Sequence, residues 1–445
     1  MQVILLAAGQ STRLDPIADK NTLEFAGKPL IEHQIAALKK AKLRDIAVVA
    51  NKFNIEKITA ILKKYKNVVV VEQIKLADGM AGGVLAGAEI VKHKNILVMS
   101  TNDVFDQSLF EDMIKSSKTK EIDGVIAGKK AESYFPGGYL KMDKNNLITE
   151  IVEKPGEGKE PSKFVNLVCH IYNDFPQFID YLKKSTAKTD GRYEDALDKY
   201  IKKGKAKIMA LKYAGFWQSI KYPWDIIKLM NHVLINQEPK KDISASVAKT
   251  AIINGHVVIG PNVKILDYAV IQGPSYIGEG SVVATNALVR DSMIGSNCVV
   301  GFSTEIARSY LNHDVWTHSN YVGDSIIDNN VSFGSGTVIG NLRFDEENIQ
   351  VNIKGKRISS GMNKFGAIIG SGTRFGINAS TNPGIKIGKN CFIGGGVLID
   401  NDIPDDKLVL LDQKIKITKN KADVNIKDRK RIKIDKSKKK RKKNK

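Results

Sequence analysis

Short apolar runs alternate with amphipathic stretches from the first residue to about residue 235. Runs of four or five mainly apolar residues predict β-strands at residues 3–6, 46–50, 68–71, 96–99 and 124–127. Between them, apolar residues recur at helical spacing in residues 30–40, 55–65 and 81–91. This alternation predicts βαβ units and a mainly parallel sheet, which binds its ligands at the carboxyl ends of the strands.

From residue 252 the apolar period changes to six. One strict register occupies Ile253, Ile259, Ile265, Ile271, Ile277, Val283 and Val289. After a slip of one residue it continues at Ile294, Val300 and Ile306, and a later register occupies Ile369, Phe375, Thr381, Ile387, Ile393 and Ile399. Three six-residue sides per turn, each with one side chain inside, predict a triangular parallel β-helix with a continuous core.

The predicted fold class is therefore α/β, with a β-helix as the second domain. We place the first domain at residues 1–235, a linker at 236–250, the coil at 251–412 and a basic tail at 413–445. Residues 340–368 break the hexad pattern and predict an arm that projects from the coil.

The net charge of +21 is concentrated at the carboxyl end. Residues 414–445 contain seventeen Lys or Arg and three Asp, and so supply +14 of it. Such a segment is too charged to pack, and indicates either a disordered solvating tail or a weak contact with nucleic acid or another polyanion. The three cysteines lack metal-ligand and disulfide spacing, and we find no leader and no apolar run of membrane-spanning length. We expect a soluble cytoplasmic protein.

The segment with the clearest chemistry follows the first predicted strand. The strand opens into a loop at Leu6, Ala7, Ala8 and Gly9. Free backbone N–H groups in such a loop can bind phosphate oxygens, and the two cations that follow, Arg13 and Lys20, would lie along a triphosphate. An ordinary strand–loop–helix connection is the alternative for the loop taken alone.

A second candidate is Asp103, which follows the predicted strand at 96–99. A carboxylate at a strand end beside a phosphate loop is well placed to hold Mg²⁺, which prefers oxygen ligands shared with phosphates. A turn aspartate with only local hydrogen bonds is the alternative.

Residues 5–30 resemble the signature loop of sugar-1-phosphate nucleotidyltransferases, where Leu-Ala-Ala-Gly precedes Gly-x-Gly-Thr-Arg; Ser11 replaces the second Gly. The step from Arg13 to Lys20 and the following Ala26-Gly27-Lys28 are similar to bifunctional N-acetylglucosamine-1-phosphate uridylyltransferase/glucosamine-1-phosphate acetyltransferases, in an archaeal-like variant. The resemblance extends over most of residues 1–412. It implies a Rossmann-like nucleotidyltransferase domain, a left-handed β-helix of hexapeptide repeats, and nucleotidyl transfer from UTP or dTTP to a hexose- or hexosamine-1-phosphate.

The resemblance also assigns site residues in the first domain. It implies nucleotide contacts from Gln73, Asp78 and Gly79, and sugar contacts from Gly138, Glu153 and Asn166. It places a second Mg²⁺ ligand, an Asp or Asn in the family, where this chain has Ser219.

In the coil the resemblance implies acetyl transfer from acetyl-CoA to an amino sugar-1-phosphate. His318 falls on the general base, and Arg290 and Arg308 fall on two cations that bind the sugar phosphate. Tyr321 and Asn341 fall on sugar contacts, and Lys364 lies near a family lysine that Gly366 replaces. The family's coils pack as homotrimers, so we expect the arm to reach a neighbouring chain.

Two other functions stay open at this stage. The coil could serve only as an oligomerisation scaffold for a monofunctional nucleotidyltransferase. Alternatively, with Ser219 in the metal site, the protein could bind nucleotide sugars as a non-catalytic regulator.

Overall fold

The computed structural model describes residues 1–17, 19–187 and 191–421. The described residues up to Leu410 form one compact unit, and residues 411–421 belong to a second. The described part of the second unit, residues 411–421, is exposed and contains no helix or strand. Most of the predicted basic tail, residues 422–445, lies outside the described residues. No helix in the described ranges is long and apolar enough to cross a membrane.

The first domain is built on a nine-stranded sheet. Its parallel part has the order β5-β4-β1-β6, formed by Val68–Glu72, Ile46–Ala50, Gln2–Leu6 and Ile96–Ser100. Antiparallel pairing begins at β11 (Phe164–Tyr172), which runs against β6, β8 and β9. The remaining strands are β8 (Gly124–Lys130), β9 (Gly138–Met142), β10 (Ile148–Glu153) and β12 (Ile208–Lys212). The sheet is thus mixed, and each predicted strand forms part of it.

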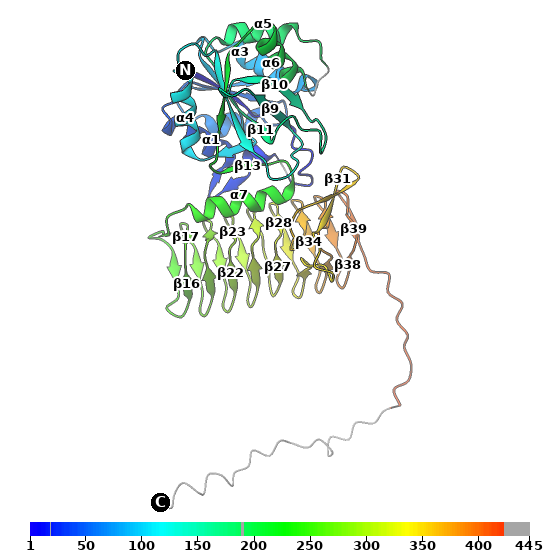
Figure 1. Cartoon of the computed structure of the whole chain (residues 1–445). Coiled ribbons are helices and arrows are strands. Elements are labelled where there is room, and N and C mark those ends of the chain that lie inside the picture. The colour runs from blue at the N-terminus through cyan, green and yellow to red at the C-terminus, as the bar shows by residue number, and fades with distance from the viewer. Residues whose placement is uncertain (18, 188–190, 422–445) are drawn as a thin grey trace, which may run out of the picture. The chain divides into compact units, whose positions relative to one another are not determined.

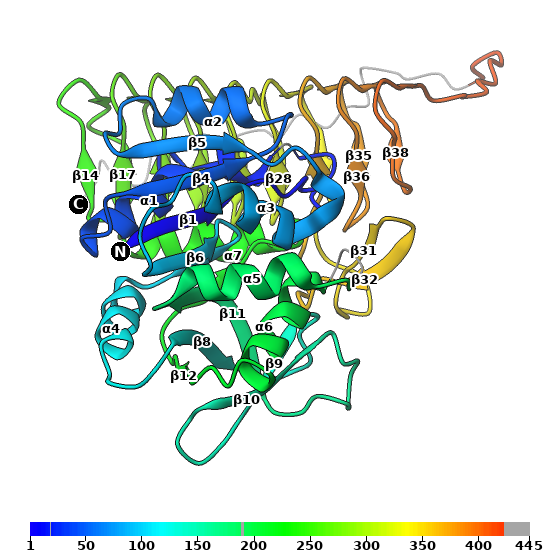
Figure 2. The ribbon, with the colours of Figure 1, turned by 90° about the horizontal axis from the view of Figure 1, so that it is seen from above.

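Helices cover both faces of this sheet (Figure 2). One face packs against α1 (Leu30–Lys40), α2 (Ile55–Leu62) and α4 (Gln107–Ser117). The other packs against α3 (Gly79–Ala88), α5 (Phe175–Lys184) and α6 (Arg192–Lys202). Successive residues of β1 alternate between the two cores, as side chains of a central strand must.

Short elements complete the loops of this domain. They are η1 (Lys20–Thr22), β2 (Glu24–Phe25), β3 (Lys28–Pro29), η2 (Leu76–Asp78), β7 (Asp103–Phe105) and β13 (Trp217–Ser219). Strand β13 pairs antiparallel with β7, which places Ser219 directly opposite Asp103.

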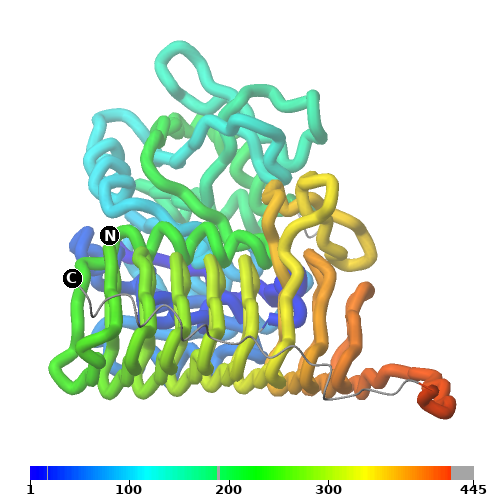
Figure 3. The backbone as a smooth tube through the Cα atoms, turned by 90° about the horizontal axis from the view of Figure 1, so that it is seen from below, coloured from blue at the N-terminus to red at the C-terminus, as the bar shows by residue number. Residues whose placement is uncertain are grey.

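The second domain is a parallel β-helix with three sheets, seen as successive rungs in Figures 1 and 3. The first sheet contains β14 (Lys240–Lys241), β17 (Val257–Ile259), β20 (Ser275–Ile277), β23 (Met293–Ile294), β26 (Tyr310–Leu311), β28 (Ile326–Ile327), β33 (Ile368–Ile369) and β36 (Lys386–Ile387). The second contains β16 (Ile252–Asn254), β19 (Val270–Gln272), β22 (Leu288–Arg290), β25 (Glu305–Ala307), β27 (Tyr321–Gly323), β30 (Val338–Ile339), β35 (Ser380–Thr381) and β38 (Leu398–Ile399).

The third face has two four-stranded parts joined through Trp316, which bridges to Val299 and Ser332. They contain β15 (Ser246–Val247), β18 (Lys264–Ile265), β21 (Val282–Val283) and β24 (Val299–Val300), and then β29 (Ser332–Phe333), β34 (Arg374–Phe375), β37 (Phe392–Ile393) and β39 (Leu408–Val409). The first strands of the coil, β14 and β15, fall inside the segment predicted as a linker.

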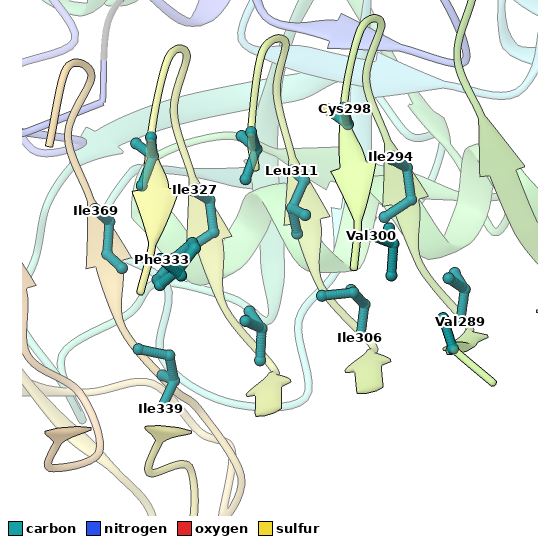
Figure 4. Close-up of a cluster of buried hydrophobic side chains, with 14 of the residues drawn as sticks. Val289, Ile294, Cys298, Val300, Ile306, Leu311, Ile327, Phe333, Ile339 and Ile369 are labelled. Atoms are coloured by element: carbon teal, nitrogen blue, oxygen red, sulfur yellow. The ribbon is translucent and has the colours of Figure 1, made fainter. Parts of the chain in front are cut away.

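The hexad positions form the core of the coil, where their side chains stack along its axis (Figure 4). Ile253 is the exception, because it is 36% exposed on β16, the edge strand of its sheet. Thr381 is buried at its hexad position although it is polar, and its hydroxyl has no hydrogen-bond partner.

The two domains share a fourth apolar core. Helix α7 (Pro223–Ile235) contributes most of its apolar side chains to it, and contacts β26 and β28 of the coil. The arm forms a hairpin of β31 (Gln350–Ile353) and β32 (Lys356–Ser359), whose Val351 and Ile353 are buried in the same core. The apolar side of the arm therefore packs within its own chain. The hexad pattern could not predict this packing, because it contains no information about the apolar surface of α7.

Candidate active sites

A cavity of about 420 Å³ opens at the carboxyl ends of β1 and β6. Eleven of the predicted residues line it: Leu6, Ala8, Gly9, Arg13, Gln73, Gly79, Asp103, Gly138, Glu153, Asn166 and Ser219. Three others lie beside it, outside its wall: Ala7, Lys20 and Asp78. The cavity wall draws on eight separate segments of the chain, which meet at the strand ends, where a parallel sheet binds its ligands.

A network of buried amides fixes the loop after β1. The carbonyl of Ala7 accepts hydrogen bonds from the amide groups of Asn21 and Asn54, both at 3.0 Å. The carboxylate of Asp19 holds the same two amides, at 2.8 and 2.6 Å. Ser11 adopts φ 56°, the left-handed region that favours glycine, which gives a physical reason for a Gly at this point of the signature. The loop is therefore rigid before any ligand binds.

The two predicted cations differ in position. Arg13 lines the cavity, with its guanidinium 5.8 Å from the ring centroid of Tyr222. Lys20 is buried beneath the loop, since a Cβ added to Gly9 would lie 3.7 Å from its Nζ. Burial lowers the pKa of Lys20 to about 8, against the opposing effect of Asp19 and Asp103. Its positive charge therefore acts on the cavity from beneath the loop and not from the cavity wall.

Gln73 supports the second loop of the cavity. Its amide nitrogen donates to the carbonyls of Lys75 and Gly79 at 3.1 and 2.8 Å, while its oxygen faces Gly83. Gly79 has φ 55° and ψ −142°, a conformation restricted to glycine. The predicted glutamine therefore shapes the loop that precedes α3, and forms part of the cavity wall.

Asp103 and Ser219 line the cavity between the loop after β1 and the three predicted sugar contacts. The indole of Trp217 donates to Asp103 Oδ1 at 2.8 Å. Burial raises the pKa of Asp103, while Trp217, Lys221 and Ser219 pull it down. Nowhere in the described ranges do three His, Cys, Asp or Glu side chains gather to hold a metal by themselves. One carboxylate beside a hydroxyl fits a Mg²⁺ ion that takes most of its ligands from substrate phosphates and water.

The three predicted sugar contacts meet on adjacent strands. Gly138 is paired with Glu153 across β9 and β10. A Cβ added to Gly138 would lie 3.1 Å from Glu153 Oε2 and 3.4 Å from Asn166 Cβ. A larger residue at Gly138 would therefore fill the space between the two polar side chains.

A second polar cluster lies on the coil, on the sheet that contains β25, β27 and β30. Asp324, which is buried, binds Arg308 through two hydrogen bonds of 2.6 and 2.7 Å. Asn341 donates to Asp324 at 2.5 Å and to the hydroxyl of Tyr321 at 3.1 Å. Three of the predicted acetyltransferase residues thus meet around a carboxylate that the sequence had not indicated as part of the site. Arg308, Asp324 and Asn341 are sixteen and seventeen residues apart, close to one turn of the coil, and this spacing was the available signal.

The other predicted coil residues flank this cluster. His318 is exposed, and in the described part of the chain its imidazole makes no hydrogen bond. Arg290 binds Glu305 at 2.7 Å. Lys364 is exposed, and Gly366 has no room for any side chain, because a Cβ would lie 2.1 Å from Ser325 Oγ.

Comparison with known proteins assigns both domains. A family model described as nucleotidyl transferase matches residues 2–234, and one described as the GMPPB C-terminal domain matches residues 235–340. The bifunctional sugar-1-phosphate nucleotidylyltransferase/acetyltransferase of Sulfurisphaera tokodaii is 34% identical, over 91% of this chain and 98% of that protein. The bifunctional protein GlmU of Methanocaldococcus jannaschii is 32% identical, over 92% of this chain and 97% of its own length.

The chain belongs to this family of bifunctional nucleotidyltransferase/acetyltransferases. Its first domain is the nucleotidyl transferase domain, and the second family match falls on the first part of the coil.

Two features of this family member were not found by sequence reasoning. The first is a buried network behind Asn166. His170 Nε2 lies 2.9 Å from Asn166 Oδ1, and its Nδ1 lies 2.7 Å from the hydroxyl of Tyr193, which in turn contacts the hydroxyl of Tyr172 at 2.6 Å. Burial lowers the pKa of His170 to about 3, so the ring is neutral and its Nε2–H donates to Asn166. The amide nitrogen of Asn166 is thereby turned toward the cavity.

The second is Lys221, which also lines the cavity. Burial lowers its pKa to about 8, and Asp103 opposes this shift. Lys221 lies two residues after Ser219, just past the end of β13, and this closeness to a predicted metal ligand was the available signal.

Proposed function

We propose that the first domain transfers a nucleotidyl group from UTP or dTTP to a hexose- or hexosamine-1-phosphate. One observation supports this above all: a single cavity is lined by a rigid phosphate loop, by Asp103 and by the Gly138, Glu153 and Asn166 trio. The loop suits the triphosphate, Asp103 suits a Mg²⁺ ion beside the phosphates, and the trio suits the sugar.

In the proposed reaction, a phosphate oxygen of the sugar-1-phosphate attacks the α-phosphorus of the triphosphate. The bond from that phosphorus to the bridging oxygen of the β-phosphate breaks, and pyrophosphate leaves. The loop N–H groups and Arg13 bind the triphosphate, and Lys20 adds positive charge from beneath Gly9. Holding the two phosphates in line is the main contribution expected of such a site.

Asp103 would hold Mg²⁺, with the Ser219 hydroxyl opposite it. When bound, the ion would neutralise phosphate charge that develops during transfer. The chain's own part is to position one carboxylate that is already oriented by Trp217.

The sugar would bind through hydrogen bonds to its hydroxyls and to any N-acetyl group. Glu153 and the outward-facing amide of Asn166 supply acceptor and donor groups, and Gly138 leaves space for the ring. Since both substrate pools and acetyl-CoA are cytoplasmic metabolites, we place the reaction in the cytoplasm.

A second activity, acetyl transfer from acetyl-CoA to an amino sugar-1-phosphate, is proposed for the coil. The cluster of Arg308, Asp324, Tyr321 and Asn341 supports it. The amine would attack the thioester carbonyl and pass its proton to the imidazole of His318, and coenzyme A would leave as its thiol. Nε and one terminal nitrogen of Arg308 bind Asp324, and its guanidinium also lies against the Tyr321 hydroxyl, so this cation is held in place within the cluster.

We propose a cyclic homotrimer as the active assembly. The exposed side chains of Trp316 and Phe302 flank the His318 loop, and are 57% and 56% exposed. Exposed aromatic groups beside a polar cluster are typical of a surface that a partner covers. A neighbouring coil would thus enclose His318.

The test is a coupled assay on the purified protein. UTP and dTTP are each combined with a panel of hexose- and hexosamine-1-phosphates and Mg²⁺, and pyrophosphate release is followed. Glucosamine- and galactosamine-1-phosphate are tested separately with acetyl-CoA, and thiol release is followed. Binding of nucleotide sugars without any pyrophosphate release would favour the non-catalytic regulator instead, and release of pyrophosphate without thiol would reduce the coil to a scaffold.

A further inference from the structure

Lys221 places an ammonium group between the nucleotide half and the sugar half of the cavity. Its Nζ donates to the carbonyl of Pro136 at 3.1 Å and lies 3.6 Å from the ring centroid of Phe135. These two residues lead directly into Gly138 and the sugar trio. On its other side, Lys221 follows β13, two residues after Ser219 and therefore close to Asp103.

The backbone at this position is fixed. The N–H groups of Lys221 and Tyr222 donate to the Asp225 carboxylate at 2.9 and 2.8 Å, which caps the first turn of α7. Helix α7 is itself anchored in the core shared by the two domains. The ammonium group is therefore presented by a rigid element, as a group that orients a substrate should be.

The neighbourhood of Asp103 shows an unusual balance of charge. The residue opposite Asp103 is the neutral Ser219, and the cationic side chain of Lys221 lines the same cavity. A second carboxylate would recruit a metal ion and its positive charge to this junction. Here a fixed ammonium group provides positive charge without a metal, at the point where the two phosphates must meet.

We propose that Lys221 binds the phosphate of the sugar-1-phosphate. Its ammonium group would supply the positive charge that a metal ion would supply if a second carboxylate stood at the position of Ser219. This inference rests on the proposed nucleotidyl transfer. It makes Lys221 a substrate-binding residue specific to the acceptor side, distinct from Arg13 in the triphosphate loop.

The experiment measures binding with and without metal. UDP-N-acetylglucosamine, dTDP-glucose and glucose-1-phosphate are titrated calorimetrically into the wild type, Lys221→Met, Lys221→Gln and Lys221→Arg in excess EDTA. Lys130→Met, an exposed lysine on β8, is the matched control. Loss of a charge-assisted bond should weaken sugar-phosphate binding about tenfold or more in the Met and Gln variants. The Arg variant and the control should bind as the wild type does.

Kinetics with Mg²⁺ provide the second reading. The KM for the sugar-1-phosphate should rise in Lys221→Met while the KM for the triphosphate stays unchanged. Adding Ser219→Asp to Lys221→Met should restore sugar-phosphate binding with Mg²⁺ present but not in EDTA.

Three results would overturn the inference: unchanged binding in both neutral variants, a rise confined to the triphosphate KM, or restoration by Ser219→Asp in EDTA. Lys221→Gln keeps a donor for Pro136, so it separates a folding defect from loss of charge. A wild type that neither binds these nucleotide sugars nor releases pyrophosphate would contradict the proposed function itself.

Discussion

The cavity of the first domain and the cluster on the coil differ in how much of a site one chain supplies. The first is a hollow of about 420 Å³ whose walls come from eight segments of one chain. The second lies on one face of a coil, where His318 and Lys364 are exposed. In both, buried polar groups orient the proposed ligand contacts: His170 behind Asn166, and Asp324 behind Arg308 and Asn341.

This difference follows from the architecture. A parallel sheet collects loops at the ends of its strands, so it encloses a ligand within one domain. A β-helix has flat faces, so it encloses a ligand only when a second surface packs against it. The two activities should therefore depend differently on assembly.

The largest expected effect separates the two sites by mutation. Asp103→Ala should reduce pyrophosphate release by about 10³-fold, because it removes the carboxylate beside the reacting phosphates. His318→Ala should reduce thiol release by about 10²-fold or more, because the amine loses its base. Each variant should keep the other activity at the wild-type level, as measured in the two assays on the same preparation. Loss of both activities in either variant would mean that the sites are not independent.

The second prediction concerns a substitution that should disrupt the proposed trimer. Trp316→Glu places a charge on the exposed face beside His318, and should convert a particle of about three times 49.0 kDa to a smaller one in light scattering. Thiol release should fall at least about tenfold, while pyrophosphate release persists. Phe53→Glu, at an exposed aromatic of the first domain, is the control and should change neither. A single-chain wild type at micromolar concentration would rule out the trimer and the shared site.

Local sequence patterns predicted most of the fold. The hexads placed one side chain inside each side of the coil, and all but Ile253 are buried. Strand ends predicted that Gly9 and Asp103 would meet, since successive parallel strands present their carboxyl ends at one edge.

Contacts between distant segments were not predictable in this way. Val351 and Ile353 of the arm are buried in the same apolar core as the side chains of α7, which lie more than a hundred residues earlier in the chain. His170 reads as one more residue of a strand, and only the packing of α6 brings the Tyr193 hydroxyl to it. Such partners depend on tertiary packing, which period and composition do not encode.

The third prediction concerns acid. His170 has a pKa of about 3 when folded and about 6.5 as a free side chain, so between these values only the unfolded chain binds its proton. Its contribution to stability is thus retained above pH 6.5 and lost as the pH falls, by about 2 kcal/mol at pH 5. Urea unfolding at pH 7 and pH 5 should show this loss in the wild type and a smaller one in His170→Gln. His93→Gln, at an exposed histidine, should behave as the wild type; equal losses in all three proteins would contradict the assignment.

The smallest effect tests the coil core alone. Thr381 occupies an apolar hexad position with a buried hydroxyl that lacks a partner, so Thr381→Val keeps the shape and removes that penalty. The free energy of unfolding should rise by about 1 kcal/mol. Thr373→Val is the matched control, because the Thr373 hydroxyl donates to Gly388 at 2.9 Å and accepts from the Cys391 N–H at 3.3 Å. It should lower the free energy by a similar amount, since the Cys391 N–H loses its acceptor. Destabilisation by both substitutions would mean that the Thr381 hydroxyl is paired in solution. Neither change should affect pyrophosphate release, because both lie in the coil, away from the cavity.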